Sequence, residues 1–243
     1  MRVTVVVITK NQRAYLERSL PMIARQTGVP GGVETVVVDS GSTDGALEVV
    51  RRHEATLVSI AAASFGYARA YNIGAAAGTG DLLVRLSGDA VPANDRWLAR
   101  LTAPFSDPTI AVTWGAQTLP PGLCNPVEHL CQRLYGYDKP DAPPVRVART
   151  RTVLGANMAT RRDLWETYPF PNIAQAEDYA YFHHFVRRGC AGMFIPGAIV
   201  VHGHSENFLR GTCRSLYQSF LQGMILANVI PYDAKKKEAE IEW

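Results

Sequence analysis

Polar side chains follow two apolar runs near the start of the chain, at the points where the runs end. Residues 3–8 lead into Thr9, and residues 33–38 lead into Asp39 and Ser40. Runs of β-branched residues without polar alternation are typical of parallel strands buried on both faces. Ligands of open α/β sheets bind outside the carboxyl ends of such strands. We therefore expect Asp39 and Ser40 to hold the ribose and base of a nucleotide, and the backbone of Thr9 to contact the base.

The first run is not followed by the glycine-rich loop that usually cradles phosphates. Neither G-x-G-x-x-G nor G-K-[ST] occurs there, because the sequence after residue 8 is TKNQ. This loop argues against a dinucleotide-binding oxidoreductase. It also argues against a nucleotidyltransferase that makes nucleotide-sugars, since such an enzyme should carry a glycine-rich loop with basic residues at this point.

The first hundred residues alternate between predicted strands and helices, which indicates a doubly wound parallel sheet. The expected strands are residues 3–8, 33–38, 57–60 and 81–86, and the expected helices begin near residue 11 and span 43–53 and 67–77. Ser42 or Thr43 is expected to cap the second helix. The second half is less regular. There we expect strands at 110–114, 153–160 and 198–201, a long loop at 119–147 with a helix near 126–134, and helices at 163–168, 176–189 and 208–229.

Composition excludes several classes of protein. Of the 243 residues, 47% are apolar and 19% are charged, which is enough core for one α/β domain and too few charges for a disordered chain. A net charge of +3 suits an enzyme of anionic substrates and gives no basic stripe for nucleic acid. No apolar stretch approaches the roughly 20 residues of a membrane span. The chain enters a strand at once and its four cysteines form no C-x-x-C pair, so we expect a cytoplasmic protein with reduced thiols.

Seven short motifs recur in the order of a known family. They are FGYARAYNIG (65–74), GD (80–81), LSGDAVP (86–92), WL (97–98), GAQ (115–117), ED (177–178) and HGH (202–204). Together they resemble the inverting, nucleotide-sugar-dependent glycosyltransferases of family 2, and most closely their rhamnosyltransferase-like branch. The resemblance implies a GT-A fold, an α/β architecture with a mostly parallel sheet and helices on both faces. It places a glycosyltransferase domain at 1–207, with a nucleotide-binding half at about 1–92, an acceptor half at about 93–207 and a helical extension at 208–243.

The resemblance implies a divalent metal on the diphosphate. Family members carry a D-x-D motif after the fourth strand, and this chain has Ser87-Gly88-Asp89, so the first aspartate is missing. Asp89 aligns with the metal ligand, and His202 or His204 would add a nitrogen, with phosphate oxygens completing a shell for Mg²⁺ or Mn²⁺. Ser87 and Gly88 are expected beside the nucleotide. Without the family pattern, Asp89 would be interpreted as a turn residue after a strand.

The resemblance also places a catalytic base at the ED pair. Asp178 matches the base that takes the proton from the acceptor hydroxyl, and Glu177 matches a neighbour that orients it. Adjacent carboxylates repel and raise a pKa, whereas a helix N-terminus favours the charged form, so the residues alone give no net direction. The alternative is an ordinary pair of acidic residues in the first turn of a helix.

Two further residues are assigned to the nucleotide by resemblance. Arg69 and Asn72 lie three positions apart and hence on one helical face. The alternative for this pair is a solvated helix surface, and the alternative for Asp39 is an Asx turn.

The sequence thus predicts an inverting transfer of a sugar from a nucleoside diphosphate to a hydroxylated acceptor. The donor suggested by the resemblance is a dTDP-deoxysugar such as rhamnose, with UDP- and GDP-hexoses equally admissible. The acceptor is a glycan, a lipid-linked glycan or a small metabolite. The alternative from another class is a binding protein with the GT-A fold that has lost catalytic activity. The altered motif at 87–89 favours this alternative, and the retained ED pair argues against it.

The tail from residue 208 carries a wide apolar stripe at helical spacing. We expect part of it to cover the acceptor end of the sheet. The rest would form a homodimer or lie peripherally on the inner membrane face, where Lys235–Lys237 would attract anionic lipid.

Overall fold

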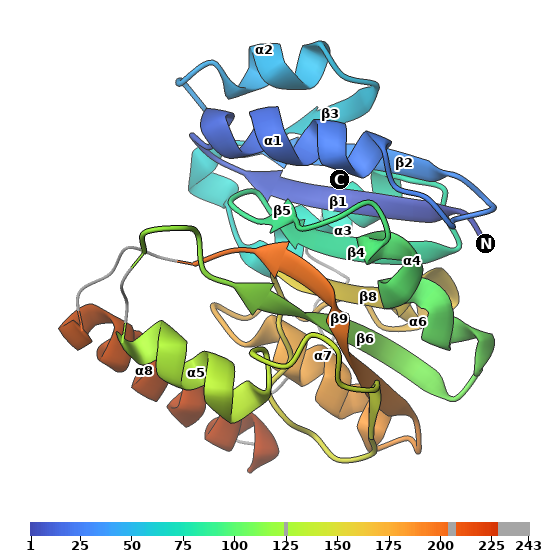
Figure 1. Cartoon of the computed structure of the whole chain (residues 1–243), viewed down its shortest axis with the longest axis vertical. Coiled ribbons are helices and arrows are strands. Elements are labelled where there is room, and N and C mark those ends of the chain that lie inside the picture. Colours follow the sequence, from blue (N-terminus) through green and yellow to red (C-terminus); the bar gives the residue numbers. More distant parts are fainter. Residues whose placement is uncertain (124–125, 204–207, 228–243) are drawn as a thin grey trace.

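The computed structural model describes residues 1–123, 126–203 and 208–227, and its described strands form one mixed sheet (Figure 1). The strand order is β3-β2-β1-β4-β8-β6-β9-β5, and β7 pairs with β9 outside this path. The strands are β1 (Val3–Thr9), β2 (Val33–Asp39), β3 (Ala55–Ser59), β4 (Leu82–Ser87), β5 (Val91–Pro92), β6 (Ile110–Thr118), β7 (Val145–Val147), β8 (Asn157–Arg161) and β9 (Ala191–Val201).

The first four strands are parallel, as predicted. β1 lies between β2 and β4, in a register that pairs Thr9 with Asp39 and Ile8 with Ser87. β1 is buried along its whole length, which explains its continuous β-branched sequence. The carboxyl ends of β1, β2 and β4 therefore meet at one edge of the sheet.

The second half of the chain adds antiparallel strand pairs to this sheet. β8 lies between β4 and β6 and is antiparallel to both, while β6 and β9 are parallel. β8 begins at Asn157 rather than at residue 153, and β9 begins at Ala191 rather than at 198. β7 forms where only a loop was expected. Apolar runs mark a buried strand but do not state its direction, because direction depends on pairing between distant segments.

The helices include every one that the sequence predicted, but several begin or end at other residues than predicted. They are α1 (Arg13–Ala24), α2 (Ala46–Arg51), α3 (Tyr67–Ala77), α4 (Trp97–Thr102), α5 (Pro126–Tyr135), α6 (Arg162–Thr167), α7 (Glu177–Val186) and α8 (Phe208–Leu226), with short 3-10 helices η1 (Ala62–Ser64) and η2 (Ala103–Ser106). The predicted cap of α2 is wrong. Gly45, with φ +88°, precedes α2, and the Ser42 hydroxyl instead accepts a hydrogen bond from the Asn11 backbone.

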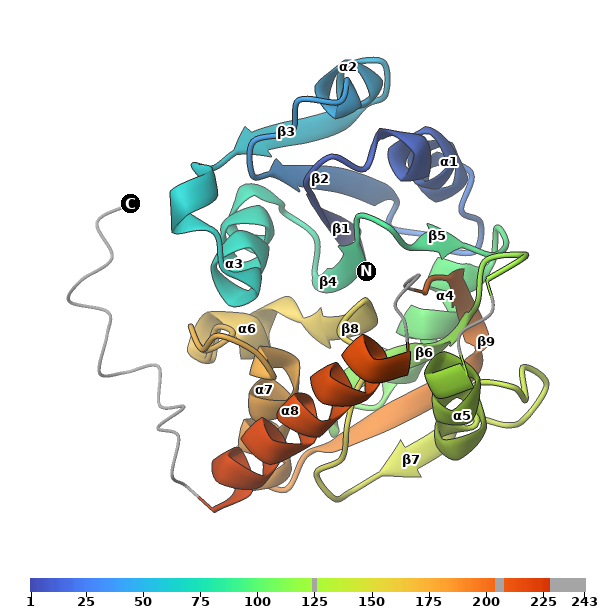
Figure 2. The same ribbon diagram turned by 90° about the vertical axis from the view of Figure 1, so that its left-hand side faces the viewer.

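Two apolar layers hold the helices on opposite faces of the sheet (Figures 1 and 2). On one face Val5 and Val7 of β1 belong to a core that includes residues of α1, α2 and α4. On the other face Val6 belongs to a core with Tyr71 of α3 and Phe182 of α7. Because side chains alternate along a strand, neighbouring valines of one strand serve both layers.

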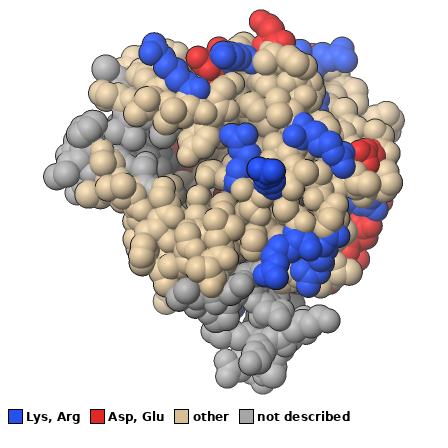
Figure 3. All heavy atoms as spheres, turned by 90° about the horizontal axis from the view of Figure 1, so that it is seen from below, with Lys and Arg blue, Asp and Glu red and all other residues tan. Residues whose placement is uncertain are grey.

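Helices α5 and α8 lie near the carboxyl edge, where Tyr135 of α5 and Gln218, Ser219 and Gln222 of α8 line one cavity. Figure 2 shows α8 crossing α7 beside α5, and α8 contacts both helices. Among the described helices, none is long and apolar enough to cross a membrane. The face shown in Figure 3 carries several groups of Lys and Arg and fewer acidic side chains.

Candidate active site

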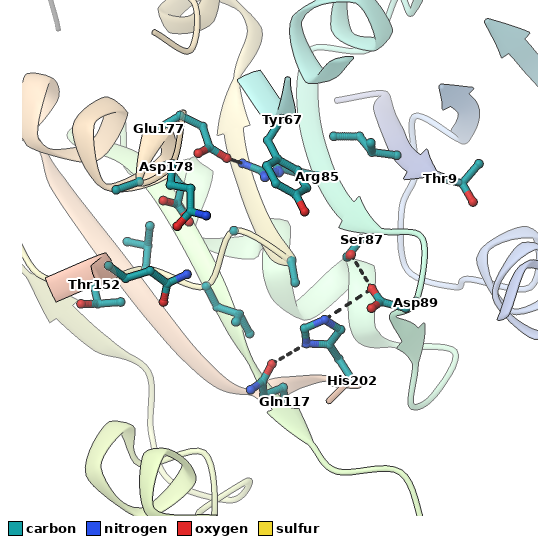
Figure 4. Close-up of a pocket in the computed structure, with 18 of the residues that line it drawn as sticks. Thr9, Tyr67, Arg85, Ser87, Asp89, Gln117, Thr152, Glu177, Asp178 and His202 are labelled. Atoms are coloured by element: carbon teal, nitrogen blue, oxygen red, sulfur yellow. Dashed lines mark hydrogen bonds and ion pairs between the residues drawn. The ribbon is translucent and has the colours of Figure 1, made fainter. Parts of the chain in front are cut away.

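A cleft of about 650 Å³ opens at the carboxyl edge of the sheet (Figure 4). Its described lining comes from the ends of β1 and β4, the chain before β8, the start of α7 and the middle of α8. Thr9, Ser40, Ser87, Asp89, Glu177, Asp178 and His202 all line it. The structure thus brings together residues that the sequence predicted from segments as distant as residues 9 and 202.

Asp89 and His202 face each other on one side of the cleft. The Nε2 atom of His202 lies 3.4 Å from Oδ1 of Asp89, and the Ser87 hydroxyl lies 2.5 Å from the same Oδ1. On the far side of the ring, His202 Nδ1 is 2.7 Å from Oε1 of Gln117. An amide oxygen only accepts, so this bond assigns the ring proton to Nδ1 and directs Nε2 towards the Asp89 carboxylate.

These residues fit a divalent cation that is completed by its substrate. One carboxylate and one imidazole nitrogen are suitable ligands for Mn²⁺ or Mg²⁺, and diphosphate oxygens are suitable for the remaining positions. Gln117 acts as the partner that fixes the histidine ring, as is usual for histidine ligands. Among the described residues no group of three His, Cys, Asp or Glu side chains gathers. The third predicted ligand, His204, lies outside the described residues.

Glu177 and Asp178 occupy the first turn of α7, opposite Asp89 in the cleft (Figure 4). The preceding residue, Ala176, has φ +63°, in the left-handed region that non-glycine residues rarely adopt. Glu177 is buried and its Oε1 lies 2.7 Å from Nη1 of Arg85, a buried residue of β4. The Arg85 guanidinium also lies over the Tyr67 ring, 5.8 Å from its centroid. An ion pair therefore joins α7 to the strand that leads to Asp89.

Asp178 has the electrostatics of a general base. Burial, helped by the negative charge of Glu177, raises the pKa of Asp178 to about 6, and Arg85 opposes that rise. One carboxylate oxygen accepts a hydrogen bond of 2.7 Å from the Tyr179 backbone. The other carboxylate oxygen packs against the backbone of Gly155, where any side chain would overlap it. A carboxylate with a pKa near 6 is ionised at neutral pH and accepts a proton more readily than an exposed one.

The ends of β1 and β2 form the part of the cleft expected to hold the base. The Ser40 backbone N–H donates to the Thr9 carbonyl at 3.2 Å, and both residues line the cleft. Asp39 is buried and is absent from the described lining. Its carboxylate accepts the backbone N–H groups of Gly41 at 2.9 Å and Ser42 at 3.1 Å, which is an Asx turn. Its contact with a nucleotide stays a prediction.

Asn72 differs from its predicted role. Its side-chain Nδ2 donates to the Phe170 carbonyl at 2.9 Å, and its Oδ1 accepts from Trp165 Nε1 at 2.9 Å and from the Phe170 backbone at 3.1 Å. Asn72 thus fastens α3 to the chain around α6 and does not line the cleft in the described structure. No local pattern indicates this role, because the partners of Asn72 lie more than 90 residues away.

Arg69 and Gly88 also lie outside the described lining. Arg69 projects from α3, and its Nε is buried without a hydrogen-bond partner among the described residues. Gly88 packs on the Ile8 carbonyl and on Gln12, leaving no room for a side chain. Gly88 thus allows the turn before Asp89 to close against β1, and neither residue contacts the described cleft.

Sequence reasoning missed Arg85, Gln117 and Lys10 as lining residues. Arg85 had a usable signal, since it is a charged residue inside an apolar strand, two and four positions before Ser87 and Asp89. Alternate residues of a strand share one side, so the side chains of Arg85 and Ser87 belong together, at the end of the strand that leads to Asp89. Gln117 stands in the GAQ motif, but nothing local to it indicates a histidine 85 residues away.

The sequence matches the family model described as Glycosyl transferase family 2 over residues 4–167. That segment runs from β1 to α6 and includes Arg85 and Asp89. Glu177, Asp178 and His202 lie beyond it. The match therefore covers Arg85 and Asp89, and the structure brings Glu177, Asp178 and His202 into the same cleft.

Three similar proteins illustrate the range of the comparison. The validoxylamine A glucosyltransferase of Streptomyces hygroscopicus subsp. limoneus is 49% identical over 51 residues, which are 21% of this chain and 11% of that protein. The O-antigen chain rhamnosyltransferase RfbN of Salmonella typhimurium is 26% identical over 215 residues, which are 84% of this chain and 67% of that protein. A mannosyltransferase of Pyrobaculum calidifontis, solved with GDP-Man and Mn²⁺, has a TM-score of 0.72 and 25% identity, covering 91% of this chain.

All three of these relatives are longer than this chain, since each match covers a smaller share of the relative than of this chain. The match spans 11% of the glucosyltransferase and 64% of the mannosyltransferase. Similarity to the solved structure, together with the sheet described above, identifies the architecture as the GT-A fold that the sequence predicted.

Proposed function

Because the chain belongs to glycosyl transferase family 2, we propose that it transfers a sugar from a nucleoside diphosphate to an acceptor hydroxyl with inversion. The observation that carries the proposal is the placement of Asp178 across one cleft from Asp89 and His202. One side of this cleft suits a base, and the other suits a leaving diphosphate.

In the proposed reaction Asp178 takes the proton from the acceptor hydroxyl. The acceptor oxygen then forms a bond to the anomeric carbon while the bond from that carbon to the phosphate oxygen breaks. The nucleoside diphosphate leaves with the electron pair. Attack and departure on opposite faces of the sugar invert the anomeric configuration.

The surrounding residues prepare Asp178 for this role. Arg85 neutralises Glu177, so that the first turn of α7 carries one net negative charge at Asp178 when both carboxylates are ionised. Gly155 lets the carboxylate lie against the backbone, which fixes its position. Since general bases contribute about 10²–10⁴-fold to a rate, correct placement of this single carboxylate matters.

Asp89 and His202 are the residues that would hold Mn²⁺ or Mg²⁺. A bound divalent cation would neutralise charge that develops on the departing diphosphate. Ser87 stands where family members have the first aspartate, and its hydroxyl holds the Asp89 carboxylate. This bond supports a working site over a binding protein that has lost its chemistry.

The relatives support the donor class that we propose. One is named a rhamnosyltransferase, and another was solved with GDP-Man and Mn²⁺. We propose a dTDP-deoxysugar such as dTDP-rhamnose, or a GDP- or UDP-hexose. Residues 1–92 would provide most nucleotide contacts, residues 93–207 most acceptor contacts, and residues 208–243 an extension that completes the site.

Release of nucleoside diphosphate from dTDP-rhamnose, UDP-glucose and GDP-mannose, with Mn²⁺ and with EDTA, tests this function. We expect release from one donor, a strong reduction by EDTA, and loss of both metal and donor affinity in Asp89→Asn. Arg146→Gln is a matched control, because Arg146 pairs with Asp107 on the surface outside the described cleft lining. No donor binding by calorimetry, or release that EDTA leaves unchanged, would contradict the proposal or its metal.

A further inference from the structure

Helix α8 presents three different surfaces along its described residues. Leu221 and Ile225 pack against Tyr179 and Ala180 of α7. Leu216, Tyr217 and Phe220 are exposed. The third surface is polar, and it consists of Gln218, Ser219 and Gln222, all of which line the cleft. Gln222 follows Gln218 by four positions and Ser219 by three, so both side chains lie beside that of Gln222 on one polar face. We call it the α8 polar face.

The α8 polar face is linked to the wall that holds Asp178. The Thr152 hydroxyl donates to Gln222 Oε1 at 3.0 Å. Three residues later, the Gly155 backbone packs against the Asp178 carboxylate. The segment from 152 to 155 therefore connects α8 to the base, and Figure 4 shows Thr152 and Asp178 on the same side of the cleft. A molecule that places a hydroxyl on Asp178 would lie beside these glutamines.

Two aromatic rings line the same cleft. Tyr135 at the end of α5 is half-buried, and Tyr137 just after it is buried against Phe194, with 5.7 Å between the two tyrosine ring centroids. Aromatic rings with polar edges pack against the C–H faces of sugars while offering a hydroxyl for a hydrogen bond. Amides and phenols around one cavity suit a ligand with many hydroxyl groups.

The charged groups of the lining are concentrated elsewhere. Among the described lining residues the charged side chains are Lys10, Arg85, Asp89, Glu177 and Asp178. Arg85 is paired with Glu177. Lys10 follows β1 on the nucleotide side. The described lining residues of α5 and α8 thus carry amides, hydroxyls and phenols, with no cation to offset a phosphate or carboxylate placed beside Asp178.

We propose that the α8 polar face, with Tyr135 and Tyr137, is an acceptor subsite for an uncharged sugar, in which Gln218 and Gln222 determine specificity. This inference rests on the proposed glycosyl transfer. It adds the acceptor class, since a phosphorylated or carboxylated acceptor would meet the carboxylates of Glu177 and Asp178 with no cation among the described lining residues of α5 and α8.

The test compares Gln218→Leu and Gln222→Leu with Leu216→Gln, a control on the exposed surface of the same helix. Leucine favours helices at least as well as glutamine, so α8 is retained. Donor binding is measured first by calorimetry. Transfer is then measured to the methyl glycosides of rhamnose, glucose and mannose, and to 3-phosphoglycerate as the charged probe. Binding of the same glycosides is followed by saturation-transfer NMR with nucleoside diphosphate and Mn²⁺ present.

We expect a methyl glycoside to be the better acceptor. Each glutamine variant should raise the KM for that glycoside about tenfold, the equivalent of one hydrogen bond. The KM for donor and the kcat at saturating acceptor should stay within a factor of two, and Leu216→Gln should match the wild type. A merely structural role for the glutamines would instead lower kcat or alter donor binding.

Three outcomes would overturn the inference while leaving the proposed function intact. In the first, the wild type binds donor but neither binds any neutral glycoside nor transfers sugar to one. In the second, it prefers 3-phosphoglycerate as acceptor. In the third, the glutamine variants have the same acceptor KM as the wild type. Failure of the wild type to bind any donor would overturn the proposed function itself, and this inference with it.

Discussion

Arg85 of β4 and Glu177 of α7 form an ion pair of 2.7 Å beneath the base, with both side chains less than a tenth exposed. They lie 92 residues apart in the sequence and connect the strand before Asp89 to the helix that carries Asp178. Breaking such a pair on one side leaves an uncompensated buried charge, which usually costs several kcal/mol. The pair therefore couples the fold of the active site to the electrostatics of its base.

Transfer should depend on pH through Asp178. Since burial and Glu177 raise its pKa to about 6, and a base must be ionised to act, kcat/KM should fall tenfold per pH unit below 6 and be constant above it. Glu177→Gln removes the like charge, which lowers the pKa and should move this limb to lower pH. Initial rates from pH 4.5 to 8.5 at subsaturating acceptor measure it. If kcat/KM of Glu177→Gln fell over the same pH range as that of the wild type, the fall could not be assigned to Asp178.

Asp178→Asn should abolish transfer and stabilise the protein at high pH. The folded-state pKa lies above the ordinary 3.8, so the ionised carboxylate destabilises the fold at pH 8, and protonation relieves this as pH falls from 6 to 4. Urea unfolding should show a gain of about 1–3 kcal/mol for the variant at pH 8 that disappears near pH 4. Asp163→Asn provides the opposite sign, because Arg161 lowers the pKa of Asp163 and that charge is stabilising. A gain that does not vary with pH would show that burial of the ionised carboxylate is not its cause.

Local patterns predicted the parts of the site that lie at strand and helix ends. The carboxyl ends of β1 and β4 and the start of α7 follow from apolar runs and an acidic first turn. The sequence could not show that β8 is antiparallel between β4 and β6, or that Arg85 meets Glu177, because both depend on contacts between segments more than 40 residues apart. Asn72 illustrates the same limit. The family resemblance implied that Asn72 faces the nucleotide, whereas its amide is bonded to the distant residues Trp165 and Phe170.

Gly155→Ala should impair the base without removing it. A methyl group at this position would overlap the Asp178 carboxylate, so the carboxylate must move away from its present place. We expect kcat to fall by 10-fold or more while donor affinity changes less than twofold, since misplacement of a reacting group by about 1 Å can cost 10²-fold. Gly223→Ala serves as the comparison, because Gly223 has open space around it and, like Gly155, no positive φ that would strain an alanine. Equal kcat values in both variants would show that the position of Asp178 is not fixed by residue 155.

Removal of residues 208–243 should cost both stability and transfer. Ile225 is fully buried against α7, and Leu221 packs beside it, so the truncation uncovers Tyr179 and Ala180 one turn from Asp178. Loss of these two side chains alone should lower the free energy of unfolding by roughly 3–5 kcal/mol. The truncation also removes the α8 polar face and with it one wall of the cleft.

A chain ending at residue 227 is the matched control, because it keeps α8. We expect this control to retain the activity and unfolding temperature of the full chain, while the chain ending at 207 unfolds at least 5 °C lower and transfers sugar at least tenfold more slowly. Light scattering on the same samples tests whether the exposed Leu216, Tyr217 and Phe220 join two copies. A chain ending at 207 with full activity, the same unfolding temperature and the same oligomeric size would show that α8 contributes nothing to the site.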